Sequence, residues 1–366
     1  MLDSGTGDLR DRNHHQIAIK QGVRSRLLLR VRRHFDYAGK HFFPTLRLKI
    51  VEIVDIANAI QQIKQVRSGG LADKASKSTE ANLWDQIKVS SFVLLFTVAY
   101  SVSIVATVLR VQLHILARNA TMYNDEDGTN ASPSELELKY LIDSTFRYIF
   151  SDGLKNLTNT LRVKVENALV DWTVREKISV QFVEFVDIIS YIRKSTEKDM
   201  KSFVEMIISI PSFPPGSNGQ HKLGPSVEEL FSQSADIFES QMFRAVLLEA
   251  FDCSFRLLTE DFKDQIFLDN INSKATIGSG AEDRISNSNS GNSSSGIQHF
   301  NRPSKSPPLA TLLPQMKSSA LRFLPLSGIG DGVSEIVSGP NSLTLCSAII
   351  DSTSKSSREL VLNRGI

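Results

Sequence analysis

Residues 83–118 read LWDQIKVSSFVLLFTVAYSVSIVATVLRVQLHILAR, and the 21 positions from Val89 to Leu109 carry no charged side chain. This charge-free segment is as long as a membrane-spanning helix, which needs about 20 predominantly apolar residues. Six of its residues are Ser or Thr, and helix-like sequence continues beyond the flanking Lys88 and Arg110. The central helix of a large bundle, apolar on all sides because other helices surround it, explains the pattern equally well. The residues alone therefore leave a membrane span and a buried bundle helix as equal alternatives.

Helical periodicity extends outward from this segment in both directions. After Pro44, apolar residues from Leu46 to Ile63 recur at spacings of three and four, which predicts an amphipathic helix. The pattern and the helix-start signals predict further helices over 78–118, 132–170 with an interruption at Gly153, 173–208, 225–255 and 308–323. Because no sustained two-residue alternation bounded by turns appears, the predicted fold class is all-α, with long helices.

The composition along the chain divides it into four parts. Residues 271–307 are rich in Ser, Asn and Gly and predict a disordered insertion, since such a segment cannot offset its ordering entropy by burial. The predicted domains are a basic N-terminal segment (1–44), a helical bundle (45–270), this insertion, and a C-terminal helix of the bundle with a tail (308–366). Residues 10–40 hold nine Lys and Arg against two Asp. That excess fits a membrane-surface segment and a solvated basic arm about equally.

The residues that could act as catalytic groups or metal ligands show no arrangement typical of an enzyme. The 42 basic and 40 acidic residues nearly cancel, which argues against a general nucleic-acid binder. Cys253 and Cys346 have no metal-ligand spacing and indicate a reducing compartment. No phosphate-binding loop, zinc-protease, hydrolase or kinase motif is present. We therefore predict no catalytic residues, no metal, no cofactor and no small-molecule substrate.

Three strings within and on both sides of the charge-free segment resemble the hallmark sequence of the peroxin-3 family of peroxisome biogenesis factors. They are LWDQIK at 83–88, SF at 91–92 and LRVQLHIL at 109–116, at the same spacing as in the family. Weaker similarity extends over about 32–325. The resemblance implies a large twisted all-α bundle on the peroxisomal membrane, facing the cytosol. It also implies a docking role, in which an amphipathic helix of the receptor-chaperone peroxin-19 lies in an apolar groove.

The resemblance also implies the residues of that groove. The family's key tryptophan falls on Trp84, which suits a binding hot spot. Leu83, Ile87 and Lys88 match positions around it, and Leu71 is a looser candidate upstream. Arg110 and Gln112 match the family too, but for these two we favour a structural role inside the bundle.

The chain departs from the family pattern at several positions. Residues 1–49 contain no apolar run of about 18 residues that would match the family's membrane anchor. Glu80 stands where a basic residue is common, and His114 and Ala117 replace the usual Asn and Gly. The predicted function is nevertheless a non-enzymatic docking factor for insertion of peroxisomal membrane proteins, with peroxin-19 and the lipids of that membrane as partners. The alternative is a single-span membrane protein anchored by residues 89–109, with a scaffold or adaptor role.

Overall fold

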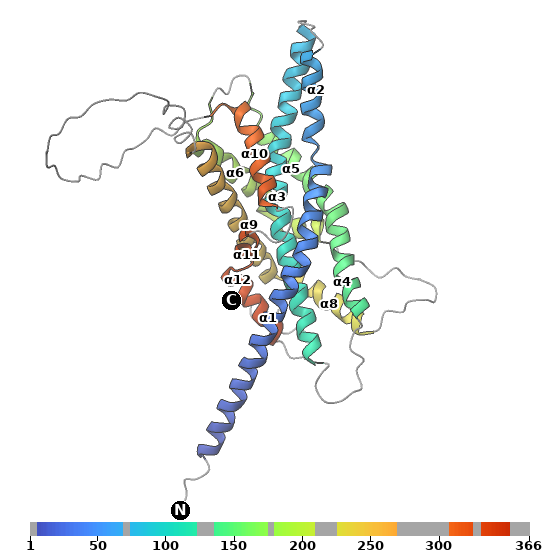
Figure 1. Cartoon of the computed structure of the whole chain (residues 1–366), viewed down its shortest axis with the longest axis vertical. Helices are drawn as coiled ribbons and strands as arrows, with labels where there is room; N and C mark the ends of the chain where they lie inside the picture. The colour runs from blue at the N-terminus through green and yellow to red at the C-terminus, as the bar shows by residue number, and fades with distance from the viewer. Residues whose placement is uncertain are drawn as a thin grey trace, which may run out of the picture.

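A computed structural model describes residues 6–68, 74–122, 135–174, 179–208, 225–268, 307–324 and 331–351. Every regular element in these ranges is a helix, which confirms the predicted all-α class. The helices form one bundle (Figure 1). They are α1 (Thr6–Ile53), α2 (Ile56–Ser68), α3 (Lys74–Met122), α4 (Glu135–Tyr148), η1 (Ile149–Gly153), α5 (Leu154–Ala168), α6 (Phe182–Thr196), η2 (Glu197–Asp199), α7 (Met200–Ile207), α8 (Pro225–Glu239), α9 (Gln241–Phe262), η3 (Lys263–Leu268), α10 (Leu309–Phe323), α11 (Asp331–Ile336) and α12 (Pro340–Asp351).

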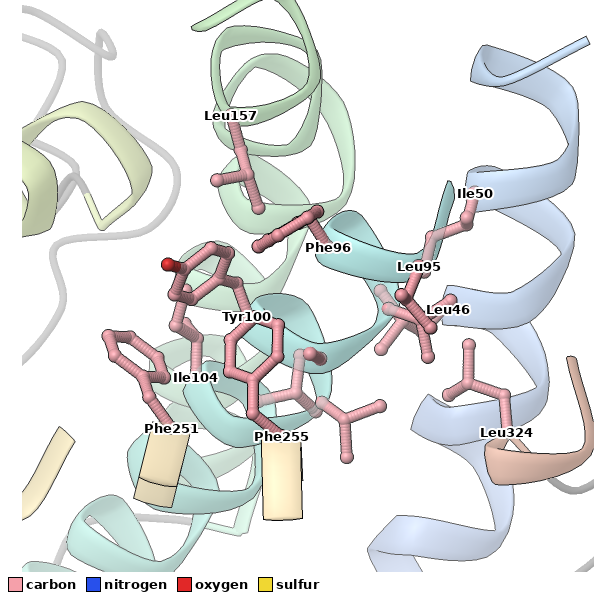
Figure 2. Packing of buried hydrophobic residues seen from close by; sticks show 14 of the residues in the cluster. Leu46, Ile50, Leu95, Phe96, Tyr100, Ile104, Leu157, Phe251, Phe255 and Leu324 are labelled. Carbon is pink, nitrogen blue, oxygen red and sulfur yellow. The ribbon is translucent and has the colours of Figure 1, made fainter. Parts of the chain in front are cut away.

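The long helix α3 runs through the centre of the bundle. Helices α1, α2, α5, α9, α10 and α12 all pack against it. Figure 2 shows Phe96 and Tyr100 meeting α9 on one side of α3, while Leu95 meets α1 on another. Because neighbours surround the middle of α3, its charge-free segment is buried on every side rather than along one stripe.

The charge-free segment is therefore covered by protein. Helix α3 has the length and apolarity of a candidate membrane span over Ser78–Asn119, and the most apolar stretch within it is completely buried. From Ser90 to Leu109 every residue is buried. The structure thus gives residues 89–109 the role of a bundle spine, which was one of the two readings left open by the sequence.

Several serine hydroxyls of this segment are accommodated by hydrogen bonds, whereas the hydroxyls of Thr97 and Thr107 are buried without a hydrogen-bond partner among the described residues. Ser91 Oγ donates to the carbonyl of Ile87 at 2.7 Å. Ser103 Oγ lies 2.9 Å from the carbonyl of Ala99 and 2.6 Å from the hydroxyl of Ser254 on α9. Buried hydroxyls that are satisfied in this way cost little free energy. Their small size also lets α9 approach α3 closely.

The helix predicted from Leu46 to Ile63 is divided and begins much earlier. Pro44 lies inside α1, and the chain turns at Val54 and Asp55 before α2 begins. Asp55 accepts a hydrogen bond from the backbone N–H of Asn58 at 3.1 Å, so its carboxylate caps α2. The predicted limit of the basic segment at residue 44 consequently falls within a continuous helix.

Two other predicted boundaries were also wrong. The helix predicted to begin near Thr173 begins at Phe182, where the backbone N–H of Gln181 donates to the Glu184 carboxylate at 3.0 Å. The single helix predicted over 225–255 is two helices, α8 and α9. They are separated at Ser240, whose hydroxyl accepts from the backbone N–H of Phe243 at 3.1 Å.

The C-terminal region contains more structure than the sequence pattern indicated. Helix α10 confirms the helix predicted over 308–323. Helices α11 and α12 were not predicted, although Val333, Ile336 and Leu345 are buried. The predicted insertion at 271–307 lies outside the described residues, apart from Pro307.

Candidate docking site

The α2–α3 hairpin forms one end of the molecule, away from the projecting N-terminal part of α1 (Figure 1). Trp84 on α3 is half-buried there. Its indole Nε1 donates to Glu80 Oε1 at 3.4 Å, one helical turn earlier. Arg67, in the last turn of α2, donates to the same carboxylate oxygen at 3.0 and 2.7 Å. Glu80 thus joins the two helices and orients the tryptophan.

Arg67 also contacts the face of the indole ring. Its guanidinium carbon lies 5.9 Å from the centroid of the Trp84 ring, at the outer limit of a cation–π contact. The Arg67 side chain is 59% exposed and that of Glu80 is 26% exposed, so solvent weakens their ion pair. We call Arg67, Glu80 and Trp84 the docking patch: an aromatic centre with a charged rim.

Two predicted groove residues lie beneath this patch. Leu83 and Ile87 are 6% and 5% exposed and belong to the hydrophobic core, as does Ile63 on α2. These three residues thus belong to the core of the α2–α3 hairpin, whose two helices pack against each other. Leu71, the remaining apolar candidate, lies outside the described residues.

Lys88 lies in the interior of the bundle and is 5% exposed. Its ammonium group donates to the carbonyl of Trp172 at 2.6 Å and to that of Leu169 at 3.3 Å, and it pairs with Asp85 at 3.1 Å. The carbonyls belong to the turn after α5, where a cation offsets the helix dipole. In this structure Lys88 attaches the docking hairpin to the body of the bundle.

Arg110 and Gln112 also lie within the bundle, as the sequence analysis favoured. Arg110 donates to the backbone carbonyl of Val337 before α12. Gln112 is fully buried and donates to the hydroxyl of Thr145 on α4 at 2.8 Å. These side chains connect α3 to helices that are distant in sequence.

His114 is 1% exposed, and its Nδ1 lies 2.7 Å from the carbonyl of Arg110. Burial lowers the pKa of His114 to about 4, below the usual 6.5. As the pH falls, His114 gains a proton near pH 6.5 in the unfolded chain but only near pH 4 in the folded chain. The contribution of His114 to the free energy of unfolding is therefore fully present above pH 6.5 and is lost between pH 6.5 and pH 4. From pH 7 to pH 5 the free energy of unfolding should fall by about 2 kcal/mol from this group.

Chemical denaturation at both pH values measures this fall, and His114→Asn is the matched variant because asparagine does not titrate. The variant should lose about 2 kcal/mol less than the parent chain between pH 7 and pH 5. Parallel losses in the two proteins would contradict the assignment.

The residues that sequence reasoning missed are those of the charged rim. Glu80 was noted only as a departure from a family pattern, and Arg67 was not identified. The sequence did contain one indication of this pair: Arg67 and Glu80 carry opposite charges and lie on either side of the short connection between two helices. Among the residues that the structure describes, no group of three or more His, Cys, Asp or Glu side chains could hold a metal ion.

The described residues thus define an all-α bundle with one buried central helix and an aromatic patch at a hairpin end. Residues 57–123, which coincide with α2 and α3, match the family model Peroxin-3. The chain is 23% identical over 267 residues to peroxisome biogenesis factor 3 of Dictyostelium discoideum. It is 25% identical over 115 residues to peroxisomal biogenesis factor 3 of Mus musculus and of Homo sapiens.

These comparisons confirm the predicted resemblance to the peroxin-3 family. The similarity covers 64% of this chain and 63% of the Dictyostelium protein, and 30% of this chain and 30% of each mammalian protein. The chain therefore matches about three fifths of one curated relative and under a third of the others.

Proposed function

We propose that this chain acts in peroxisome biogenesis as a docking factor for peroxin-19 at the peroxisomal membrane, with its helical domain facing the cytosol. The observation that carries the proposal is the family match over residues 57–123, because the matched segment is the hairpin that presents Trp84. The curated relatives are themselves named as biogenesis factors. Docking of this kind requires no catalytic residues.

The chemistry of the docking patch fits an amphipathic helix as the occupant. A half-buried tryptophan offers a large rigid apolar surface, and such residues dominate the binding energy of many interfaces. Arg67 and Glu80 offer one charge of each sign beside it, which can fix the register of a partner helix. Leu83, Ile87 and Lys88 contribute by supporting this surface from below.

Binding of purified peroxin-19 to the full chain, measured by calorimetry, tests the proposal. Trp84→Ala should weaken the affinity at least tenfold, which corresponds to about 1.4 kcal/mol, because the aromatic surface is removed. Trp84→Phe should retain part of the affinity. Helicity measured by circular dichroism should not change, since Trp84 is only half-buried.

The matched control replaces the other tryptophan of the chain. Trp172 is 8% exposed and packs edge-on against Phe92 at 6.1 Å between ring centroids. Trp172→Phe should leave peroxin-19 affinity unchanged while altering stability. An unchanged affinity in the folded Trp84→Ala variant would overturn the docking assignment.

A further inference from the structure

We propose that the outward side of α1 binds an anionic membrane surface. Several exposed residues there each lie three or four positions from another member of the set, so they share one side of the helix. We call this set the basic face; it consists of Arg26, Leu29, Arg30, Arg33, Tyr37 and Lys40.

The opposite side of α1 fixes the direction of the basic face. Val31, Phe35 and Phe43 are 4%, 6% and 0% exposed and belong to the hydrophobic core. Packing of α1 against α3 therefore holds the basic face towards solvent. In Figure 1 the N-terminal part of α1 extends beyond the rest of the bundle, at the end opposite the α2–α3 hairpin. The side chains of the basic face are all exposed, so a membrane can contact them without any rearrangement of the fold.

The charge of this region is strongly one-sided. Residues 25–41 contain five Lys and Arg but a single acid, Asp36, and all six of these side chains are exposed. The whole chain has a formal charge of only +2. Positive charge is thus concentrated on α1, where the headgroups of anionic lipids would neutralise it.

Apolar side chains on the same face favour a membrane over a nucleic acid or an acidic protein segment. Leu29 is 57% exposed and Tyr37 is 69% exposed, and both lie between the cations. Leucine and tyrosine enter the boundary between headgroups and acyl chains, while Arg and Lys remain at the phosphate level. Residues 26–40 belong to one helix, so the face is about 21 Å long and can contact a planar surface along its length.

Flotation of the full chain with lipid vesicles tests this proposal. The chain should bind vesicles of phosphatidylcholine containing phosphatidylserine, and bind much less to phosphatidylcholine alone. Joint replacement of Arg26, Arg30 and Arg33 by Gln should weaken binding on the order of a hundredfold, because each basic residue contributes about 1 kcal/mol, or about fivefold. These side chains are exposed, so the variant should fold normally.

A charge-matched variant separates the basic face from net charge. Joint replacement of Lys64, Lys155 and Lys198 by Gln removes three exposed cations from other helices. It should bind anionic vesicles nearly as well as the parent chain. Equal losses in the two triple variants would overturn the proposal, as would failure of the parent chain to bind anionic vesicles.

The apolar residues distinguish a membrane from an acidic protein partner. Joint replacement of Leu29 and Tyr37 by Ser should weaken vesicle binding several-fold at unchanged charge. No effect of this change, together with full displacement by polyglutamate, would indicate an acidic protein partner and reject the membrane. Peroxin-19 affinity of the triple Arg variant should be unchanged, so this proposal and the docking proposal can fail independently.

Discussion

Replacement of Tyr100 by alanine is expected to lower the free energy of unfolding by about 3–5 kcal/mol, the range for removing a buried aromatic ring. Tyr100 on α3 is 0% exposed. Its ring centroid lies 4.7 Å from that of Phe251, 5.1 Å from that of Phe255 and 5.3 Å from that of Phe203. These rings come from α9 and α7, so removal of the Tyr100 ring would leave a cavity where α3, α7 and α9 meet. Urea denaturation followed by circular dichroism measures the loss.

The variant Tyr100→Phe separates the hydroxyl group from the ring. The hydroxyl donates to Glu197 Oε1 at 2.9 Å, and Arg193 pairs with the same carboxylate at 2.8 Å. Burial, followed by the Glu197 carboxylate, raises the pKa of Tyr100 well above its usual value, so the phenol remains neutral. The Phe variant should lose about 1.5–3 kcal/mol, the value of a hydrogen bond to a charged group. A loss under 1 kcal/mol in Tyr100→Ala would contradict the packing described for α3.

Replacement of Lys88 by methionine is expected to lower the free energy of unfolding by about 3 kcal/mol. Methionine keeps the length of the side chain but removes two charge-assisted hydrogen bonds to backbone carbonyls. Urea unfolding of the variant and of the parent chain at neutral pH measures this difference in the free energy of unfolding.

The affinity of the Lys88→Met chain for peroxin-19 decides whether Lys88 contacts the partner or only supports the hairpin. Under conditions in which the Lys88→Met chain is folded, its affinity for peroxin-19 should fall less than that of Trp84→Ala. Exposed Lys64→Met on α2 is the matched control and should change the free energy of unfolding by less than about 0.5 kcal/mol. An unchanged stability with a tenfold weaker affinity would place Lys88 in the binding surface instead.

The sequence predicted the helical class well because apolar periodicity and the absence of strand patterns are local signals. It predicted helix ends poorly, because these depend on tertiary contacts. Pro44 looked like a helix start, since proline removes a backbone donor. Burial of Phe43, Leu46 and Ile50 in the core nevertheless keeps α1 continuous.

The division between α8 and α9 shows the opposite case. The capping hydroxyl of Ser240 was visible in the sequence, but the unbroken apolar pattern concealed the break. For the candidate site, a resemblance identified Trp84 but could not show which neighbours are exposed. Lys88 is interior because the turn at 169–172, about eighty residues later, folds onto it.

The central position of α3 has a consequence for the nascent chain during its synthesis. The ribosome releases α3 long before α9 and α10, two of the helices that cover it in the finished bundle. Until they emerge, the charge-free segment has the length and apolarity that membrane-insertion machinery recognises. Its buried Ser and Thr residues reduce that apolarity without preventing burial in protein. The nascent chain is therefore most exposed to misdirected insertion and to aggregation between the completion of α3 and that of α10.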